Sequence, residues 1–127
     1  MAKKVKKQTQ AHSFKVAFLG IGRTFASELH MKIHLIFAIL ALLACAILQV
    51  SKIDWIIVIL CIALVFAAEL INTALEALCD KVCTDYDPLI GKAKDVMAGA
   101  VLMLAIASVV VGLLIYVPAA MRLFNIG

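Results

Sequence analysis

The sequence is 127 residues long, of which 65% are apolar and 16% charged, and it has a mean hydropathy of +1.11 and a formal net charge of +4. A soluble domain needs a more polar surface than this composition supplies, so the sequence predicts an integral membrane protein with a single domain over residues 1–127. The four cysteines lie in or beside apolar runs, which argues against a secreted disulfide scaffold and for reduced thiols. A chain this short also needs other copies of itself to wall a large ligand site, so we expect an oligomer.

Residues 1–13 begin with the basic run MAKKVKK, and no small-residue cleavage site follows a short apolar core. They are therefore predicted to form a cytoplasmic tail rather than a removable signal peptide. A surface helix is expected over residues 14–29, because its apolar side chains recur every three or four residues and so share one stripe. Such an amphipathic helix is expected to lie in the membrane interface. The stripe consists of Phe14, Phe18, Ile21, Phe25 and Leu29.

Three apolar segments are long enough to cross about 30 Å of hydrocarbon at about 1.5 Å per residue. They cover residues 33–50, 55–78 and 96–117. In the third segment small residues recur at intervals of seven, which allows another helix to approach one face closely. These small residues are Ala98, Ala105 and Gly112.

Polar residues mark where the second and third of these helices begin. The short turn SKID makes the first two spans an antiparallel pair, and Asp54 is the predicted N-cap of the helix that opens at Trp55. Asp87 is the predicted N-cap of the third helix, because Pro88 follows it and proline fits the first helical turn.

The basic residues are divided unequally between the two predicted sides of the membrane. Two of them, Lys52 and Arg122, fall on one side, and ten fall on the side of the N-terminus. Since basic residues favour the cytoplasmic side, the N-terminus, the end of the second span and the start of the third are predicted to meet the cytoplasm. The ten residues are Lys3, Lys4, Lys6, Lys7, Lys15, Arg23, Lys32, Lys81, Lys92 and Lys94.

The end of the second span carries polar side chains within the sequence AAELINTALEALCD. Four of them fall within an arc of about 80° on a helix and rise by about 16 Å along its axis. They are Glu69, Asn72, Glu76 and Asp80. An acidic side chain at the centre of a span costs roughly 2.5 to 3.5 kcal/mol, so an aligned set indicates a site rather than helix packing alone. We expect this acidic stripe to face neighbouring helices, with Glu69 deepest.

Lys94 and Asp95 stand across the loop, at the start of the third span. Carboxylate oxygens suit a hard divalent cation, a lysine suits a phosphate, and a carboxylate at the depth of a lipid hydroxyl can accept its proton. Phosphoryl transfer depends mainly on positioning and on charge neutralisation by Mg²⁺ and cationic side chains. Together these residues predict an enzyme that phosphorylates a membrane lipid.

Other interpretations of the polar residues are weaker. His30 with His34, and Cys79 with Cys83, are four residues apart and could each bind a metal, but neither pair has the further ligands of a structural zinc site. Packing cysteines and interfacial histidines are favoured instead. A small proton-coupled multidrug exporter also carries a membrane glutamate, but that alternative predicts a fourth span. A non-catalytic membrane adaptor would not need the acidic stripe.

Several stretches resemble the signature of the small prokaryotic diacylglycerol kinase and undecaprenol kinase family. They are AELINTALEALCD followed by KAKDVMAGAVL, together with FKVAFLGIGRTFASE and MKIH, and the resemblance extends over about residues 14–117. It implies an all-α membrane protein in the cell membrane, a homotrimer of three-span subunits with an amphipathic surface helix and active sites shared between subunits. It also implies transfer of the γ-phosphate of ATP, bound with Mg²⁺, to a lipid hydroxyl, with no nucleic acid partner.

The same resemblance implies roles for single residues. Glu69 matches the catalytic base, supported by Asn72, and Glu28 and Glu76 match the carboxylates that hold metal ions on the ATP phosphates. The remaining nucleotide contacts are implied for Lys94 and Asp95, for the loop residues Asp85, Tyr86 and Asp87, and, as a polar support, for Asp80. From the residues alone Glu28 is an ordinary surface carboxylate. Asp87 departs from the family pattern, which has a histidine there, and His30 stands where an asparagine is common.

The lipid acceptor is suggested by a subset of these motifs. ELINTALE, YDPL and MKIH are more similar to the Gram-positive-type branch of the family, for which undecaprenol is the expected acceptor. Diacylglycerol is the alternative, because both lipids present a primary hydroxyl at the interface.

Overall fold

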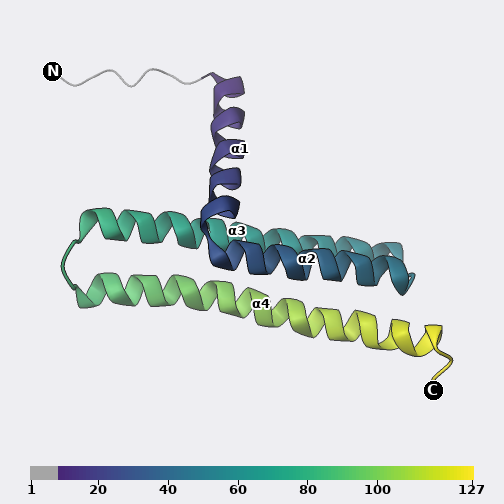
Figure 1. Cartoon of the computed structure of the whole chain (residues 1–127). Coiled ribbons are helices and arrows are strands. Elements are labelled where there is room, and N and C mark those ends of the chain that lie inside the picture. The colour runs from purple at the N-terminus through teal and green to yellow at the C-terminus, as the bar shows by residue number, and fades with distance from the viewer. Residues whose placement is uncertain (1–8) are drawn as a thin grey trace.

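The computed structural model describes residues 9–127, and within them it has four helices, shown in Figure 1. They are α1 (Gln10–Ser27), α2 (Leu29–Ile47), α3 (Lys52–Val82) and α4 (Pro88–Leu123). The central helix is α3, which packs against both α2 and α4, while α1 points away across the long axis of the other three. The predicted all-α fold is confirmed. The predicted tail, residues 1–13, lies mostly outside the described residues, and its last four residues already belong to α1.

The three packed helices differ in length. α2, α3 and α4 have 19, 31 and 36 residues, so at about 1.5 Å per residue they are about 28, 46 and 54 Å long. All three are long and apolar enough to cross a membrane. Only α2 matches the thickness of the hydrocarbon layer, about 30 Å. In Figure 1, α3 and α4 continue together beyond the start of α2 to the loop that joins them, so this hairpin end projects past the level at which α1 leaves the bundle.

The C-terminus of α2 closes with a Schellman motif. The backbone N–H of Val50 donates to the carbonyl of Cys45, and that of Gln49 donates to the carbonyl of Ala46. Gln49 has a φ of 51°, in the left-handed region that normally favours glycine. Val50 and Cys45 are both buried, and their contact stabilises this turn against the unfavourable backbone angle.

The start of α3 differs from the sequence prediction. The N-cap is Ser51, not Asp54, and the helix begins at Lys52. Asp54 instead completes a capping box, because its carboxylate accepts from the backbone N–H of Ser51 at 3.1 Å, while the Ser51 hydroxyl oxygen accepts from the N–H of Asp54 at 3.2 Å. This reciprocal pair satisfies the backbone N–H groups of both Ser51 and Asp54.

A proline lies near each end of α4. Asp87 is the N-cap, as predicted, and its Oδ1 accepts from the backbone N–H groups of Leu89 and Ile90 at 2.8 and 3.1 Å, with Pro88 in the first turn. The helix also continues through Pro118, beyond the predicted span. Burial of the next residue, Ala119, against the ends of α2 and α3 offsets the hydrogen bond that proline removes.

The first helix, α1, carries most of the apolar stripe expected from the sequence. Phe14 and Phe18 are largely exposed, and Phe25 makes an edge-to-face contact with Phe66 of α3, with ring centroids 5.2 Å apart. Leu29 does not belong to this helix, because Glu28 adopts an extended backbone conformation that ends α1, and Leu29 begins α2. The aromatic contact anchors the end of α1 beside the middle of α3.

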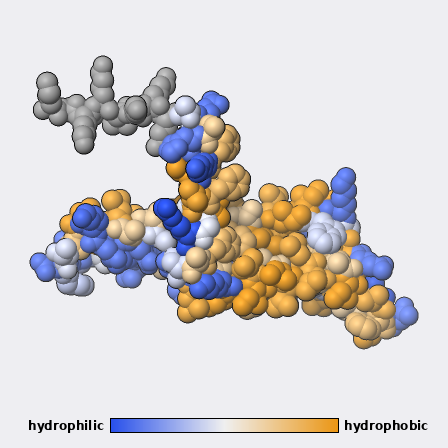
Figure 2. Space-filling view, turned by 45° about the horizontal axis from the view of Figure 1, so that its top comes forward, coloured by the Kyte–Doolittle hydropathy of each residue, from blue (hydrophilic) through white to orange (hydrophobic). Residues whose placement is uncertain are grey.

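The surface of the packed helices is strongly apolar. Figure 2 shows a continuous hydrophobic region over the middle of the molecule and hydrophilic residues gathered over one end, where α3 and α4 meet. Few side chains are buried within the chain, and many large aliphatic ones are exposed along all three long helices. Such a surface is stable only in lipid or against other apolar helices.

Candidate active site

Two polar residues of α3 are buried at packing positions. The buried residues Val58, Val65, Asn72 and Cys79 are seven apart, and Ala68 and Glu69 lie beside them on the same face. Glu69 is only 3% exposed and Asn72 only 6%. The Oδ1 atom of Asn72 is buried without a hydrogen-bond partner among the described residues. An unpaired amide oxygen is costly in an apolar setting, so Asn72 Oδ1 needs a partner from beyond the described residues.

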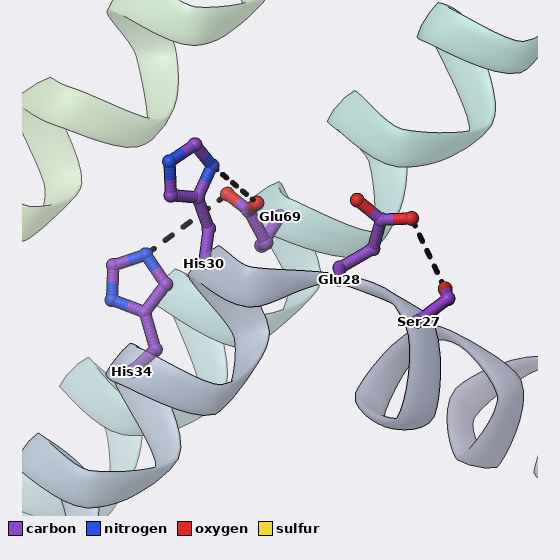
Figure 3. A network of polar contacts seen from close by, with 5 residues as sticks. All are labelled: Ser27, Glu28, His30, His34 and Glu69. Atoms are coloured by element: carbon purple, nitrogen blue, oxygen red, sulfur yellow. Dashed lines mark hydrogen bonds and ion pairs between the residues drawn. The ribbon is translucent and has the colours of Figure 1, made fainter.

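Two histidines of α2 face the Glu69 carboxylate, as Figure 3 shows. The distance from His30 Nδ1 to Glu69 Oε1 is 3.6 Å, and the distance from His34 Nε2 to Glu69 Oε2 is 4.0 Å. One imidazole therefore stands near each carboxylate oxygen, slightly too far for a direct hydrogen bond. The sequence contained a signal for this arrangement, because histidines four residues apart share a helix face, but it did not indicate that Glu69 lies opposite.

Glu28 lies at the junction of α1 and α2. It is the single extended residue between the two helices, it is half-buried, and its Oε1 accepts from the Ser27 hydroxyl at 3.1 Å. Figure 3 shows it on the segment that leads directly into the turn of α2 carrying His30. The break between the helices thus places the Glu28 carboxylate near the level of Glu69. The sequence alone does not distinguish this position of Glu28 from an ordinary surface position.

An ion pair joins α3 and α4 near the loop. Lys94 Nζ donates to Asp80 Oδ1 at 2.7 Å, and both groups are accessible to solvent. This hydrogen bond raises the pKa of Lys94, which lies on the loop side of the predicted span 96–117, above its ordinary value of 10.5. Glu76, one turn from Asp80, is half-buried, and Asp95 is exposed. The hairpin end therefore presents a fixed cation among carboxylates.

The loop between α3 and α4 presents its three predicted nucleotide residues differently. The side chain of Tyr86 is almost fully exposed, at 88%. The Cys83 thiol donates to the backbone carbonyl of Asp85 at 2.9 Å, which holds the chain as it leaves α3. Asp87 uses Oδ1 to cap α4, so in this chain the residue that replaces the family's histidine has a structural task.

An apolar groove of about 490 Å³ runs between α2 and α4, over α3. On α2 it extends from Ile33 to Ala44, about 16 Å along the helix. Ala105 and Gly112, two of the small residues predicted to allow close helix approach, line it. One end is closed by Tyr116, whose hydroxyl donates to the carbonyl of Ala41 at 3.0 Å. The other end reaches His34, so an apolar channel leads to the histidine that faces Glu69.

Comparison with known proteins identifies the family of this chain. Residues 15–116 match the sequence model of the prokaryotic diacylglycerol kinase family. The chain belongs to that family. It is therefore an enzyme of the membrane lipid kinase class, as the resemblance predicted. The exporter alternative needed a fourth span, and residues 9–127 contain three candidate spans.

Curated relatives of this lipid kinase are found in several bacteria. The undecaprenol kinase of Bacillus subtilis is 38% identical over 106 residues, 84% of this chain and 86% of the relative. The diacylglycerol kinase of Synechocystis is 37% identical over 112 residues, 87% of this chain and 64% of the relative. The diacylglycerol kinase of Escherichia coli K12 is 30% identical over 91 residues, 72% of this chain and 75% of the relative. The family is thus clear, and the relatives carry the names of two different lipid acceptors.

A ready-made metal site is absent from the residues that the structure describes. Among residues 9–127 no three His, Cys, Asp or Glu side chains are grouped to hold a metal ion, so neither the histidine pair nor the cysteine pair forms a site of that kind. Mg²⁺ usually takes one or two protein carboxylates and completes its shell with phosphate oxygens and water. The half-buried carboxylates of Glu28 and Glu76 fit that smaller requirement.

Proposed function

We propose that this lipid kinase transfers the γ-phosphate of ATP to the hydroxyl of undecaprenol, giving undecaprenyl phosphate. The observation that carries the proposal is the buried Glu69, which lies between an apolar groove and the polar hairpin end. The extensive identity to a relative named undecaprenol kinase supports this acceptor over diacylglycerol. Diacylglycerol remains the second candidate, because other relatives are named for it.

In the proposed reaction Glu69 is the general base. The lipid hydroxyl oxygen forms a bond to the γ-phosphorus, the bond from that phosphorus to the β–γ bridging oxygen breaks, and Glu69 takes the hydroxyl proton. Its burial suits this task, since a carboxylate held away from bulk water faces the lipid hydroxyl with less competition from solvent. The unpaired oxygen of Asn72, one turn along the same face, is free to orient a reacting group.

The phosphate side of the proposed site uses the hairpin end. Lys94 supplies a positive charge for the phosphates of ATP, with Asp95 beside it and Asp80 holding its ammonium group. Glu28 and Glu76 would hold Mg²⁺, which when bound supplies charge neutralisation for the phosphoryl group. Asp85, Tyr86 and Asp87 are the proposed contacts to the nucleotide from the loop.

The lipid side of the proposed site is the groove. A hydrocarbon chain lying along it would have its hydroxyl end at His34 and Glu69 and its tail toward Tyr116. The groove has no charged lining residue, so a chain there gains burial without desolvating a charge.

The assembly and the orientation in the membrane are part of the proposal. We propose a homotrimer with shared active sites, because the single chain leaves its apolar faces exposed and its metal ligands incomplete. A measured mass of three chains after subtraction of bound detergent would support it. The excess of basic residues on the side of the hairpin end supports a cytoplasmic location for this end, where ATP is present. Protection of Lys94 from an external amine reagent in intact cells tests that side.

The central experiment is a reconstitution. The purified protein in lipid vesicles, given ATP and Mg²⁺, is expected to phosphorylate undecaprenol faster than diacylglycerol, measured as radiolabel in extracted lipid. Glu69→Gln keeps the shape of the side chain and cannot accept the proton, so its rate should fall by about 10²-fold or more while the variant still binds ATP.

Two outcomes would contradict the proposal. Equal or faster phosphorylation of diacylglycerol would make diacylglycerol the acceptor in place of undecaprenol. Labelling of neither lipid would refute the proposed reaction. Full activity of the Glu69→Gln variant would remove Glu69 from the role of base.

A further inference from the structure

The carboxylate of Glu69 and the imidazole of His34 are separated by a gap that neither fills. His34 Nε2 is 4.0 Å from Glu69 Oε2, too far for a hydrogen bond between them. Both groups are well shielded from solvent, since the side chain of His34 is 21% exposed and that of Glu69 4%. A polar group that contacts both side chains would therefore be shielded from solvent as they are.

One oxygen atom fits this gap. An oxygen about 2.8 Å from both Nε2 and Oε2 would make two hydrogen bonds at an angle of about 90°, close to the angle that a hydroxyl group uses when it donates one hydrogen bond and accepts another. His34 would donate its Nε2–H to that oxygen, and the hydroxyl would donate its hydrogen to Glu69. A water molecule can make the same two hydrogen bonds. The groove, however, determines which hydroxyl group can reach His34 and Glu69.

The apolar groove reaches the gap at the histidine. His34 is a lining residue of the groove, and its ring is the polar group at the end opposite Tyr116. His30 differs, because its side chain is 74% exposed and it does not line the groove. A hydrocarbon chain in the groove that ends in a hydroxyl would therefore bring this group to His34 rather than to His30.

Other charged groups near Glu69 do not offer the same contact. On α4 no ionisable side chain lies between Asp95 and Tyr116, and Lys94 is engaged with Asp80 at the hairpin end. Within residues 9–127 the ion-pair contacts of Glu69 are those to the two histidines.

We propose that His34 is a catalytic residue of this kinase, which donates a hydrogen bond to the acceptor hydroxyl and so directs the hydroxyl proton toward Glu69. The two side chains form a two-point binding site for a primary alcohol at the end of the groove. The inference rests on the proposed function, in which Glu69 accepts that proton. It adds a hydrogen bond that fixes the hydroxyl in one orientation, with a lone pair left for the γ-phosphorus.

The experiment compares three substitutions in the full-length protein in vesicles. His34→Phe keeps a ring of similar size and removes the donor, whereas His34→Gln places an amide N–H near the position of Nε2. His12→Phe, on the exposed first turn of α1, is the matched control. We expect His34→Phe to lower kcat/KM for the lipid by about 5- to 30-fold with an unchanged KM for ATP, and His34→Gln to recover most of that loss.

The outcomes separate this inference from the proposed function. If the wild-type protein phosphorylates neither lipid, the proposed function fails. If the wild type is active and His34→Phe matches His12→Phe, the hydroxyl contact is wrong. If His34→Phe no longer binds ATP, it has lost its fold, and the test then depends on His34→Gln. Retained activity of His34→Gln with intact ATP binding supports the contact. Loss of its activity while ATP still binds overturns the contact.

Discussion

Two acidic residues of α3, one in its middle and one near its end, have different surroundings. Glu69 is buried and faces two imidazoles of α2, whereas Asp80 is exposed and paired with Lys94 at 2.7 Å. An exposed ion pair contributes little to stability because water screens it. The main effect of Asp80 is therefore to position the ammonium group of Lys94. At the scale of single residues, burial therefore separates the proposed base from a group that positions a cation.

This difference predicts the behaviour of Asp80→Asn. We expect a several-fold higher KM for ATP with little change in the melting temperature, because Lys94 loses its orientation while the exposed pair contributes little to folding. Steady-state kinetics and thermal unfolding measure the two effects. In a Lys94→Gln background the same change should have no further effect on KM, and an additive loss would show that Asp80 acts independently of Lys94.

The charge of Lys94 also predicts a pH response. The hydrogen bond that Lys94 donates to Asp80 raises the pKa of Lys94 above 10.5, so the contribution of the ammonium group is fully present below that pH and is lost only as the pH rises through the raised value. The ratio of the KM values for ATP of Asp80→Asn and wild type should therefore be the same at about pH 7 and about pH 9. A ratio that changes over this range would contradict a permanently charged Lys94.

At the scale of the helices, caps and breaks decide where the site residues stand. The extended residue Glu28 turns the chain from α1 into α2, and Asp87 begins α4 at a fixed point after the loop. Because the hairpin of α3 and α4 is longer than the hydrocarbon layer is thick, its polar end can meet water while Glu69 stays near the level of α1. The helix ends thus set the depth of each group.

The cap of α4 can be tested alone. Asp87→Ala removes the acceptor for two backbone N–H groups and should destabilise the protein by about 1 kcal/mol, whereas Asp87→Asn keeps the acceptor and should cost much less. Thermal or denaturant unfolding in detergent checks this. Asp85→Ala is the control, since only the backbone carbonyl of Asp85 is used, and equal losses for Asp85→Ala and Asp87→Ala would refute the cap.

At the scale of the whole molecule, the groove and the exposed apolar faces are the main features. The groove lies between α2, α3 and α4 and reaches the histidine that faces Glu69. The same apolar surface must be covered by lipid or by other copies of the chain.

A bulky side chain placed in the groove is expected to weaken binding of the lipid and not of ATP. Ala105→Phe places a ring in the groove and should raise the KM for the lipid by about 10-fold or more with an unchanged KM for ATP, because burial of several methylene groups is lost. Ala107→Phe, on the exposed face of the same helix, is the matched control. Equal effects of the two substitutions on lipid KM would show that the chain does not lie in the groove.

The sequence by itself determined the helical class, the three apolar spans, the Asp87 cap and the acidic stripe, because periodicity and hydropathy are local properties of the chain. It did not place Asp54 correctly, since the side chains of Ser51 and Asp54 each accept from the other's backbone N–H and only this joint geometry decides which one is the cap. The family motifs singled out Glu69, but not its partners.

Only the tertiary structure decided what surrounds that carboxylate. The histidines lie 39 and 35 positions before Glu69 in the sequence and reach it because α2 packs antiparallel on α3. The groove likewise exists only between helices that are not neighbours along the chain. A local pattern specifies which face of a helix is polar, but the packing of the other helices determines which atoms that face meets.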